Sequence, residues 1–463
     1  RSVMVKFLSH LLSPPYEFGL TKKMMMQYNY LNKERTIMSK LFLFTSVSVI
    51  GLISASGAFA DKHIQAYNEH GYFIFNTLLF LIGGFLVMWM AAGFAMLETG
   101  LVRSKNASTQ LIKNVALFSL ASIAYYIVGF NLMYPGDGNW SIENWLGALN
   151  ITSLEPVGVG SDGVTIDYAS VGSDFFFQLM FCAATASIVS GTVAERVKLW
   201  PFLIFTVLLT GIFYPISASW KWGEGWLDDR GFLDFAGSTV VHATGASAAL
   251  AGALVIGARH GRYKSDGSVV PMPGSNLPLA TLGMFILWLG WFGFNGGSQL
   301  AMGTIGDIAD ISRVFANTNT AAAGGAVAAL ISTQILYGKS DLTMVLNGAL
   351  AGLVSITAEP LTPSLGLATI IGAIGGIIIV FSVPMLDRFK VDDVVGAISV
   401  HGIAGIWGTL AVVISNPKAS LGTQLIGIVS ICLFTFIVSY IAWLILDKLI
   451  GARVSEESEV DGL

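Results

Sequence analysis

The stretch Asp234–Leu254, DFAGSTVVHATGASAALAGAL, decides the fold. Its alanines, glycines and valines are typical of a membrane helix that packs closely against its neighbours. It nevertheless begins with an aspartate and carries a histidine, His242, at mid-depth. Ionisable side chains are costly inside a bilayer and are usually retained there for function. The stretch therefore predicts a buried membrane helix whose histidine has a functional role.

Composition places the whole chain in a membrane. Of its 463 residues, 54% are hydrophobic and 12% are charged, whereas roughly 25% of the residues of a soluble domain are charged. The net charge of −4 is spread over loops and ends, which argues against nucleic acid as a partner. The two cysteines, Cys182 and Cys432, lie in separate apolar runs, so we expect neither a disulfide nor a thiolate metal site. No motif indicates a cofactor.

Residues 38–60 have the pattern of a secretory signal peptide. A basic start is followed by a short apolar stretch and by the small-residue end Ala58-Phe59-Ala60, which predicts cleavage before Asp61. Residues 1–37 are polar and patternless, and we interpret them as a non-native leader translated from upstream. The remaining expected parts are the membrane domain, 61–450, and a short cytoplasmic tail, 451–463.

Eleven apolar runs follow residue 70, which predicts an all-α polytopic membrane protein. Most have the roughly 20 residues that a helix needs to cross ~30 Å of hydrocarbon, and the shortest, 342–357, is the weakest candidate. Glycine and alanine recur through them, so we expect a tightly packed bundle. The predicted spans are 72–97, 111–134, 175–194, 199–219, 238–258, 277–298, 313–337, 342–357, 365–386, 393–415 and 421–447.

The loop charges predict which ends of the helices face the cytoplasm. Cleavage of a signal peptide would leave the new N-terminus outside, so the loops after odd-numbered spans should be inside and basic. The longest loop assigned to the outside, 135–174, contains no lysine or arginine. Both observations predict an N-out, C-in protein of a bacterial cytoplasmic (inner) membrane. The basic residues of the inside loops are Arg103, Lys105, Arg196, Lys198, Arg259, Arg262, Lys264, Lys339, Arg388 and Lys390.

Two of the six histidines, His242 and His401, lie within predicted spans. Each is eight residues from an aspartate near the start of its span, Asp234 on the outside and Asp393 on the inside, which places it ~12 Å deep at 1.5 Å per residue. The histidines should therefore meet near the midplane, and their surroundings, VVHATGASAAL and SVHGIAGIWGTL, resemble each other. This predicts a five-plus-five inverted repeat with an added C-terminal helix. Facing imidazoles can bind a small polar molecule, although a histidine in a membrane can also be a hydrogen-bonded packing residue.

Several ordered motifs resemble those of the ammonium transporter (Amt/Mep/Rh) family, and of its Amt branch in particular. The resemblance extends from about residue 72 to about residue 450. It implies a homotrimer with one pore in each subunit, and uptake of ammonium through a narrow hydrophobic channel lined by twin histidines. The matching motifs are VRSKN (102–106), AERV (194–197), DFAGSTVVHATGA (234–246), GWFGFNGGS (290–298) and SVHGIAGIWG (399–408).

The resemblance also implies roles for individual residues of this chain. The outer recruitment site corresponds to Phe181, Trp222 and Ser298, with the nearby aspartate at Asp234. The gate corresponds to Phe181 with Phe294, and the pore histidines to His242 and His401. Weaker candidates for the pore wall are Phe177, Trp291 and Thr239.

Elementary chemistry supports several of these roles and offers alternatives. Phe177 and Phe181 are four residues apart and share one helix face, and aromatic faces attract a cation by roughly 0.5–2 kcal/mol. Aromatic residues can also belong to the interfacial belt, which is the favoured interpretation of Trp220, Trp226 and Trp291. Asp234 can cap the N-terminus of its helix as well as favour a cation nearby.

A fully dehydrated cation is penalised heavily in a hydrophobic tube, so we expect neutral ammonia to cross. Ammonium would lose its proton behind the phenylalanine gate, and the resemblance implies net proton co-translocation, with methylammonium as an analogue. The alternatives are a Rh-like ammonia or carbon dioxide channel and an ammonium sensor. No intramembrane nucleophile or acid pair indicates an enzyme. Lipid is an expected partner, and a PII-type (GlnK-like) regulator is a further one that the family implies.

Overall fold

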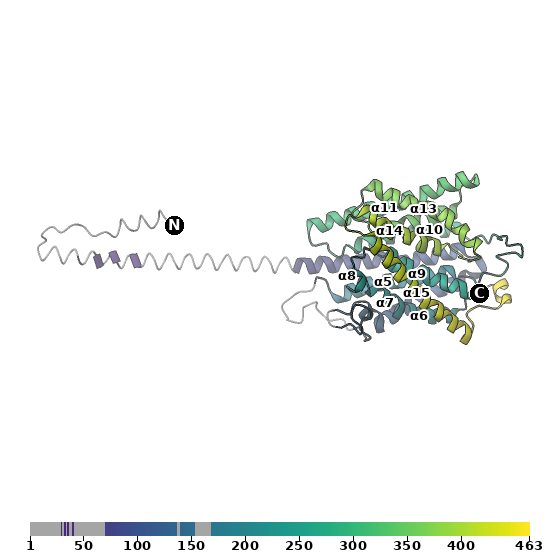
Figure 1. Cartoon of the computed structure of the whole chain (residues 1–463), viewed down its shortest axis with the longest axis horizontal. Coiled ribbons are helices and arrows are strands. Elements are labelled where there is room, and N and C mark those ends of the chain that lie inside the picture. Colours follow the sequence, from purple (N-terminus) through teal and green to yellow (C-terminus); the bar gives the residue numbers. More distant parts are fainter. Residues whose placement is uncertain are drawn as a thin grey trace. The chain divides into compact units, whose positions relative to one another are not determined.

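The computed structural model describes residues 70–136, 139–152 and 168–463, with a few single positions before residue 41. The expected leader, 1–37, and signal peptide, 38–60, lie almost wholly outside the described residues and stay predictions. Residues 70–463 form one unit, and the described part of it is helical, with isolated bridges in place of strands (Figure 1). The predicted all-α membrane fold is therefore confirmed in its class.

Within the described ranges, ten helices are long and apolar enough to cross a membrane, and an eleventh apolar helix, α12, is shorter. The first is His70–Leu101. The others, with the short helices between them, are η1 (Ser104–Asn106), α3 (Ala107–Ala124), η2 (Tyr125–Gly129), α4 (Phe130–Met133), α5 (Val171–Thr192), α6 (Leu199–Leu208), η3 (Leu209–Phe213), α7 (Tyr214–Ser219), α8 (Trp226–Asp229), η4 (Ser238–Ala243), α9 (Thr244–Ile256), α10 (Leu277–Gly297), α11 (Ile305–Tyr337), α12 (Leu342–Thr357), α13 (Leu365–Arg388), η5 (Ile398–Ile403), α14 (Ala404–Ser415), α15 (Leu421–Ile450) and α16 (Glu456–Asp461).

Most helix bounds agree with the predicted spans, and three starts differ by five residues or more. The span predicted from residue 111 begins at Ser104, because the helix extends through the polar segment before it. Helix α11 begins at Ile305 rather than at residue 313 because Thr304 and Asp307 form a capping box that extends the helix into a polar segment. The span predicted to start at residue 393 begins at Ile398, because Asp393 lies before the helix and accepts hydrogen bonds from its first N–H groups.

Glycines bring helices α11, α12 and α13 into backbone contact (Figure 1). A Cβ atom added at Gly372 would lie 2.0 Å from the carbonyl oxygen of Ala321, and one at Gly376 would lie 2.1 Å from that of Gly325. No side chain fits at such distances, so these positions require glycine. The close packing expected from the small residues of the spans is therefore present.

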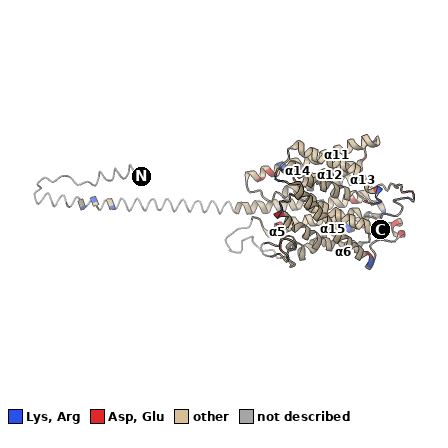
Figure 2. Ribbon diagram, in the orientation of Figure 1, with Lys and Arg blue, Asp and Glu red and all other residues tan. Residues whose placement is uncertain are grey.

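Charged residues gather at the two ends of the bundle, while its length is mostly uncharged (Figure 2). The loops predicted to face the cytoplasm meet at the end that carries the C-terminus. The buried guanidinium of Arg196 donates to the carbonyls of Thr192, Gly257 and Asp392, which joins three of these loops. Burial lowers the pKa of Arg196 to about 10, so it remains charged at neutral pH.

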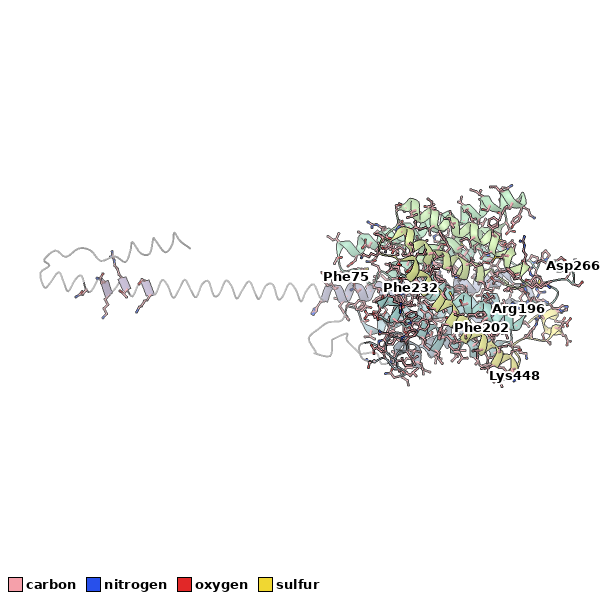
Figure 3. The ribbon with its side chains drawn as sticks, viewed as in Figure 1. Phe75, Arg196, Phe202, Phe232, Asp266 and Lys448 are labelled. Atoms are coloured by element: carbon pink, nitrogen blue, oxygen red, sulfur yellow. The ribbon has the colours of Figure 1, made fainter. Side chains whose placement is uncertain are left out.

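The tail, residues 451–463, contacts the same end. The Lys105 ammonium donates to the carbonyl of Glu459, and Arg453 pairs with the Glu459 carboxylate at 2.8 Å. Helix α8 lies at the opposite end (Figure 1), and Figure 3 places Phe75 and Phe232 toward that end and Arg196 toward the tail. We call the end with the tail the inner end, and the end with α8 the outer end.

Candidate functional site

The two histidine-bearing segments repeat one pattern, D-x-x-G-x-x-x-V-H, at Asp234–His242 and Asp393–His401. The equal distance of each histidine from its aspartate was part of the sequence-based expectation, whereas the matching glycine of each copy, Gly237 and Gly396, was not recognised. Both glycines have a positive φ, 104° at Gly237 and 84° at Gly396, a conformation that side chains disfavour. Each segment therefore turns sharply after its aspartate and enters a π-helical stretch, η4 or η5, a geometry frequent at functional sites.

Asp234 caps the outer of these segments. Its two carboxylate oxygens accept hydrogen bonds from four backbone N–H groups, at residues 237 to 240, with lengths between 2.8 and 3.0 Å. Its backbone carbonyl accepts the indole N–H of Trp222 at 3.0 Å. The side chain is 1% exposed. The N-cap interpretation of Asp234 therefore fits the contacts of its carboxylate, and its backbone carbonyl holds Trp222, a recruitment candidate, in position.

Asp393 occupies the matching position at the inner end. Its carboxylate accepts hydrogen bonds from the N–H groups of Ala397 and Ile398, and from the hydroxyl of Thr192 at 2.9 Å. Burial raises the pKa of Asp393 to about 6, against the effect of these hydrogen bonds. The neighbouring carboxylate of Asp392 is also buried, but the guanidinium groups of Arg259 and Arg196 hold its pKa well below the usual range.

The structure brings the two histidines into direct contact. The Nδ1 atoms of His242 and His401 lie 3.1 Å apart, and their ring centroids lie 5.1 Å apart. At this distance the two nitrogens can share one hydrogen bond, which requires a protonated Nδ1 on one ring and a bare Nδ1 on the other. The residues are 1% and 4% exposed. Two buried imidazoles thus form a pair in the interior of the bundle. The segment of His242 enters from the outer end, and the segment of His401 enters from the inner end.

A line of contacting aromatic rings leads from His242 toward the outer end. The His242 ring stacks on Phe294 with 5.2 Å between centroids, Phe294 lies 4.1 Å from Phe181, and Phe181 lies 5.9 Å from Trp222. Trp291 also stacks on His242, at 5.1 Å, and donates its indole N–H to Thr357. The interfacial-belt interpretation is wrong for Trp291 and for Trp220, since they are 0% and 6% exposed.

The outer end of this line opens into a cavity of about 510 Å³, which we call the outer cavity. The hydroxyl of Ser298, one of its lining residues, donates to the carbonyl of Phe294 at 2.8 Å, which leaves its oxygen lone pairs to accept a proton from a ligand. The lining includes two acids, Asp174 and Glu224, and no lysine or arginine. The lining residues are Tyr134, Gly136, Tyr168, Asp174, Gln178, Phe181, Trp222, Gly223, Glu224, Phe235, Ser298 and Leu300.

Asp174 and Gln178 were missed by the sequence analysis although a signal for them exists. They precede Phe181 by seven and three residues on α5 and so lie on the same helix face. Once Phe181 is placed in the outer cavity, that spacing brings both polar side chains to the cavity wall. The search for aromatic recruitment residues did not follow this face.

Phe177 and Thr239, the other pore-wall candidates, are not among the residues that line the outer cavity. The Phe177 ring packs 4.8 Å from Phe181 and fills the space beside Gly297, where an added Cβ would lie 2.6 Å from it. The Thr239 hydroxyl pairs with that of Thr409 at 2.6 Å. Phe177 therefore packs against the line of rings, and Thr239 pairs with a neighbouring helix.

A second, small cavity adjoins the histidine pair on the inner side. It has room for about 10 Å³ and is lined by His401, together with Phe94, Leu97, Glu98, Ser187, Ile188, Gly191, Asn347, Leu350, Val395, Ala397 and Val400. We call it the inner cavity. Among the described residues, no cluster of three or more histidines, cysteines or carboxylates could hold a metal ion. Between the outer cavity and the inner cavity, the contacting side chains described above are aromatic rings and the two imidazoles.

Known proteins share this architecture. The profile of the Ammonium Transporter Family matches residues 78–463. The ammonium transporter Amt2 of Archaeoglobus fulgidus is 39% identical over 90% of this chain and 92% of its own. A solved structure described as Sensor Amt Protein is 34% identical, with a TM-score of 0.77 over 84% of this chain and 96% of its own. Mep2 of Candida albicans is 25% identical, with a TM-score of 0.72 over 83% of this chain and 87% of its own.

The match extends over most of the chain, and it agrees with the resemblance carried by the sequence motifs. The helical membrane fold of the described residues agrees as well. The chain therefore belongs to the Ammonium Transporter Family.

Proposed function

We propose that the protein takes up ammonium, strips it of a proton and conducts ammonia past the twin histidines, with net proton co-translocation. The observation that carries this proposal is the unbroken line of rings from Trp222 through Phe181 and Phe294 to the histidine pair, with centroid separations of 4.1 to 5.9 Å. The line begins at one cavity and ends at another.

The outer cavity supplies what a small cation needs. The faces of Phe181 and Trp222 attract it by roughly 0.5–2 kcal/mol, and the Ser298 oxygen accepts one of its N–H groups. Glu224 adds negative charge to the lining and Asp174 adds a second carboxyl group, and no lysine or arginine lines the cavity. A cation is therefore concentrated at this end before it meets the gate.

The Phe181–Phe294 pair marks the point where a cation stops. With 4.1 Å between their centroids, the rings leave no space between them for a hydrated ion. Beyond them the pathway offers aromatic carbon and two imidazoles, too few oxygens to replace the water of an ion. Ammonium can lose a proton and pass as ammonia, whereas potassium cannot, which gives selectivity between ions of similar size.

The histidines receive the ammonia. Nε2 of His242 is buried and has no hydrogen-bond partner among the described residues, so it is available to a molecule in the pore. The shared hydrogen bond between the Nδ1 atoms lets a proton change place between the rings. This pair is the feature that we assign to coupling ammonia flux with proton movement.

Membrane topology and assembly complete the proposal. We infer that the ten long helices and α12 all span, as eleven helices, N-out and C-in, because the basic loops predicted to be cytoplasmic share the inner end with the tail. The repeated D-x-x-G-x-x-x-V-H pattern supports the inverted repeat. The homotrimer, the bacterial inner membrane and a PII-type regulator at the inner end are proposed from the family alone, whose members include an archaeal protein.

An ammonium sensor is the second candidate, favoured by the likeness to the structure described as Sensor Amt Protein. A sensor needs the outer cavity to bind ammonium but needs no flux. A Rh-like channel needs flux of a neutral gas but moves no charge. Charge movement therefore separates the three functions.

The experiment is a measurement of current on a proteoliposome-coated surface after addition of ammonium, with methylammonium uptake followed in parallel. The transporter gives both a sustained current and uptake, and potassium gives neither. Uptake without current would establish the Rh-like channel. Binding without either would establish the sensor.

A further inference from the structure

A buried polar cluster lies beside the inner cavity and takes no part in the pathway described so far. Its centre is Glu98, near the inner end of the first helix and 1% exposed. One oxygen of Glu98, Oε2, accepts hydrogen bonds from Ser190 at 2.9 Å, from Asn114 at 3.0 Å and from Gln110. A carboxylate is costly inside a membrane helix unless both of its oxygens are satisfied. Because three donors bind one oxygen of Glu98, the surroundings of the other oxygen need to be accounted for.

The other oxygen, Oε1, has no hydrogen-bond partner among the described residues and is buried. It faces the backbone of Gly191, where an added Cβ would lie 3.6 Å from it, and both residues line the inner cavity. His401 lines the same cavity. The inner cavity has a volume of about 10 Å³, which is close to the smallest volume that can hold one water molecule. A single water there would have a carboxylate oxygen and an imidazole within one small space.

The cluster continues from Glu98 toward the inner end. Lys113 is 1% exposed, lies over the ring of Phe202 and donates to the carbonyl of Ser190 at 2.9 Å. Figure 3 labels Phe202 in this half of the bundle. Gln110 and Lys113 also line a second narrow pocket, together with Asn106 and Glu195 of the inner loops. Polar groups thus extend from the inner cavity to the inner loops, beside the ammonia pathway.

We propose that Glu98 is the proton acceptor that takes the proton from the histidine pair toward the inner end. The proposal rests on the proposed function, because it needs a proton released by ammonium. Ammonium gives its proton to the unpaired Nε2 of His242, and the hydrogen bond between the Nδ1 atoms passes a proton on, so that His401 becomes an imidazolium. The imidazolium gives an N–H proton to water in the inner cavity, and that water gives a proton to Oε1 of Glu98. His401 returns to neutral imidazole, and Glu98 becomes a neutral acid. Release of the proton to water at the inner end restores the carboxylate.

This arrangement separates two products that leave by different routes. Ammonia follows the apolar pore, while the proton follows buried side chains that accept and donate hydrogen bonds. The charge of Lys113 beside the cluster compensates the carboxylate between turnovers. Glu98 touches the proton and not the ammonia, so its removal should affect the turnover of charge more than the recruitment of ammonium.

The test replaces Glu98 and compares it with a matched control. Glu98→Gln keeps the size of the side chain and cannot take up a proton as a carboxylate does. Glu359→Gln makes the same change at another carboxylate that is 8% exposed, which accepts hydrogen bonds from Leu361, Thr362 and Asn416 and lines neither inner pocket. Ammonium-induced current is measured for each variant in proteoliposomes, after size-exclusion chromatography and a melting temperature have established the fold.

We expect Glu98→Gln to lower the saturating current at least tenfold while the half-saturating ammonium concentration changes less than threefold. Glu359→Gln should keep a current within twofold of the parent. A merely structural role for Glu98 would instead lower the melting temperature and leave the current per folded protein unchanged. A current within twofold of the parent in folded Glu98→Gln overturns the relay.

A second variant, Ser187→Val, tests the same proposal if Glu98→Gln does not fold. Ser187 lines the inner cavity, and its hydroxyl donates within its own helix to Ala183. Ser187→Val adds a methyl group to the space of the water and leaves Glu98 intact. We expect at least a threefold lower current, and an unchanged current would overturn the relay. If the parent protein itself carries no ammonium current, the proposed function fails instead, and the two failures are thereby distinguished.

Discussion

The outer and inner copies of the D-x-x-G-x-x-x-V-H pattern have the same spacing and different surroundings. The outer aspartate, Asp234, has its carboxylate bonded to four backbone N–H groups, while Asp393 accepts two backbone N–H groups and one hydroxyl. His242 stacks on Phe294 and Trp291. His401 has one aromatic neighbour besides His242 among the described residues, Phe94 at 6.2 Å.

The difference shows that the same local motif can have different chemical surroundings, because different side chains pack against each copy. On the outer side it is surrounded by aromatic rings and a cavity of about 510 Å³, which suits capture of a cation. On the inner side the cavity is about 10 Å³ and contains a carboxylate, which suits the handling of a proton. The repeat places the two imidazoles in contact, and their different neighbours are the basis for the direction of transport that we propose.

The largest effect is expected from removing either imidazole. His242→Ala and His401→Ala should each lower ammonium-induced current at least tenfold, because the hydrogen bond between their Nδ1 atoms needs both rings. Oligomer size on a chromatography column should be unchanged. Unaltered methylammonium uptake in His242→Ala would refute the pore assignment. If only one of the two variants loses its current, the halves are functionally less alike than the shared pattern implies.

A smaller effect should distinguish the outer rings from the inner one. Phe181→Ala removes a cation-binding face, so the half-saturating ammonium concentration should rise by about 2- to 30-fold, the equivalent of roughly 0.5–2 kcal/mol. Phe94→Ala removes a ring that lines the inner cavity, and its half-saturating concentration should stay within twofold. Equal shifts in the two variants would show that the outer cavity has no special part in recruitment.

The smallest effect concerns the carboxylate at the inner copy. Burial raises the pKa of Asp393 to about 6, so its folded state holds a proton that the unfolded chain releases above its usual pKa of about 3.9. Its contribution to stability is present below pH 4 and lost as the pH rises through 6. The melting temperature of Asp393→Asn, taken relative to the parent, should therefore increase from pH 4 to pH 6 and then level off.

A control for this pH profile lies next to it in the chain. Arginine neighbours hold the pKa of Asp392 low, although burial acts in the other direction. Its contribution to stability is present above the unfolded pKa and lost as the pH falls below it. Asp392→Asn should thus approach the parent in melting temperature as the medium becomes more acidic. A flat difference for Asp393→Asn would mean that its carboxylate is solvated like an ordinary one.

The helices were predictable because the length of an apolar run and the residues that cap it are properties of consecutive residues. The spans 199–219 and 342–357 agree with the structure to the residue. Errors occurred where a polar side chain shifts a helix start, as Thr304 does for α11 and Asp393 does for η5. The site was less predictable. Phe181, Trp222 and Ser298 line one cavity, but Thr239, expected in the pore wall, is not among its lining residues and bonds to Thr409.

By itself, the sequence determined which segments are apolar enough for a membrane, which of the loops are basic, and that two histidines lie at equal distance from their aspartates. These are properties of neighbouring residues. Only the tertiary structure decided that residues 159 apart in the chain place their imidazole nitrogens 3.1 Å from each other. It also decided that Glu98, one of whose carboxylate oxygens has no partner among the described residues, lines the same cavity as His401. Contacts of this kind depend on how helices pack, and packing is set by side chains on both partners at once.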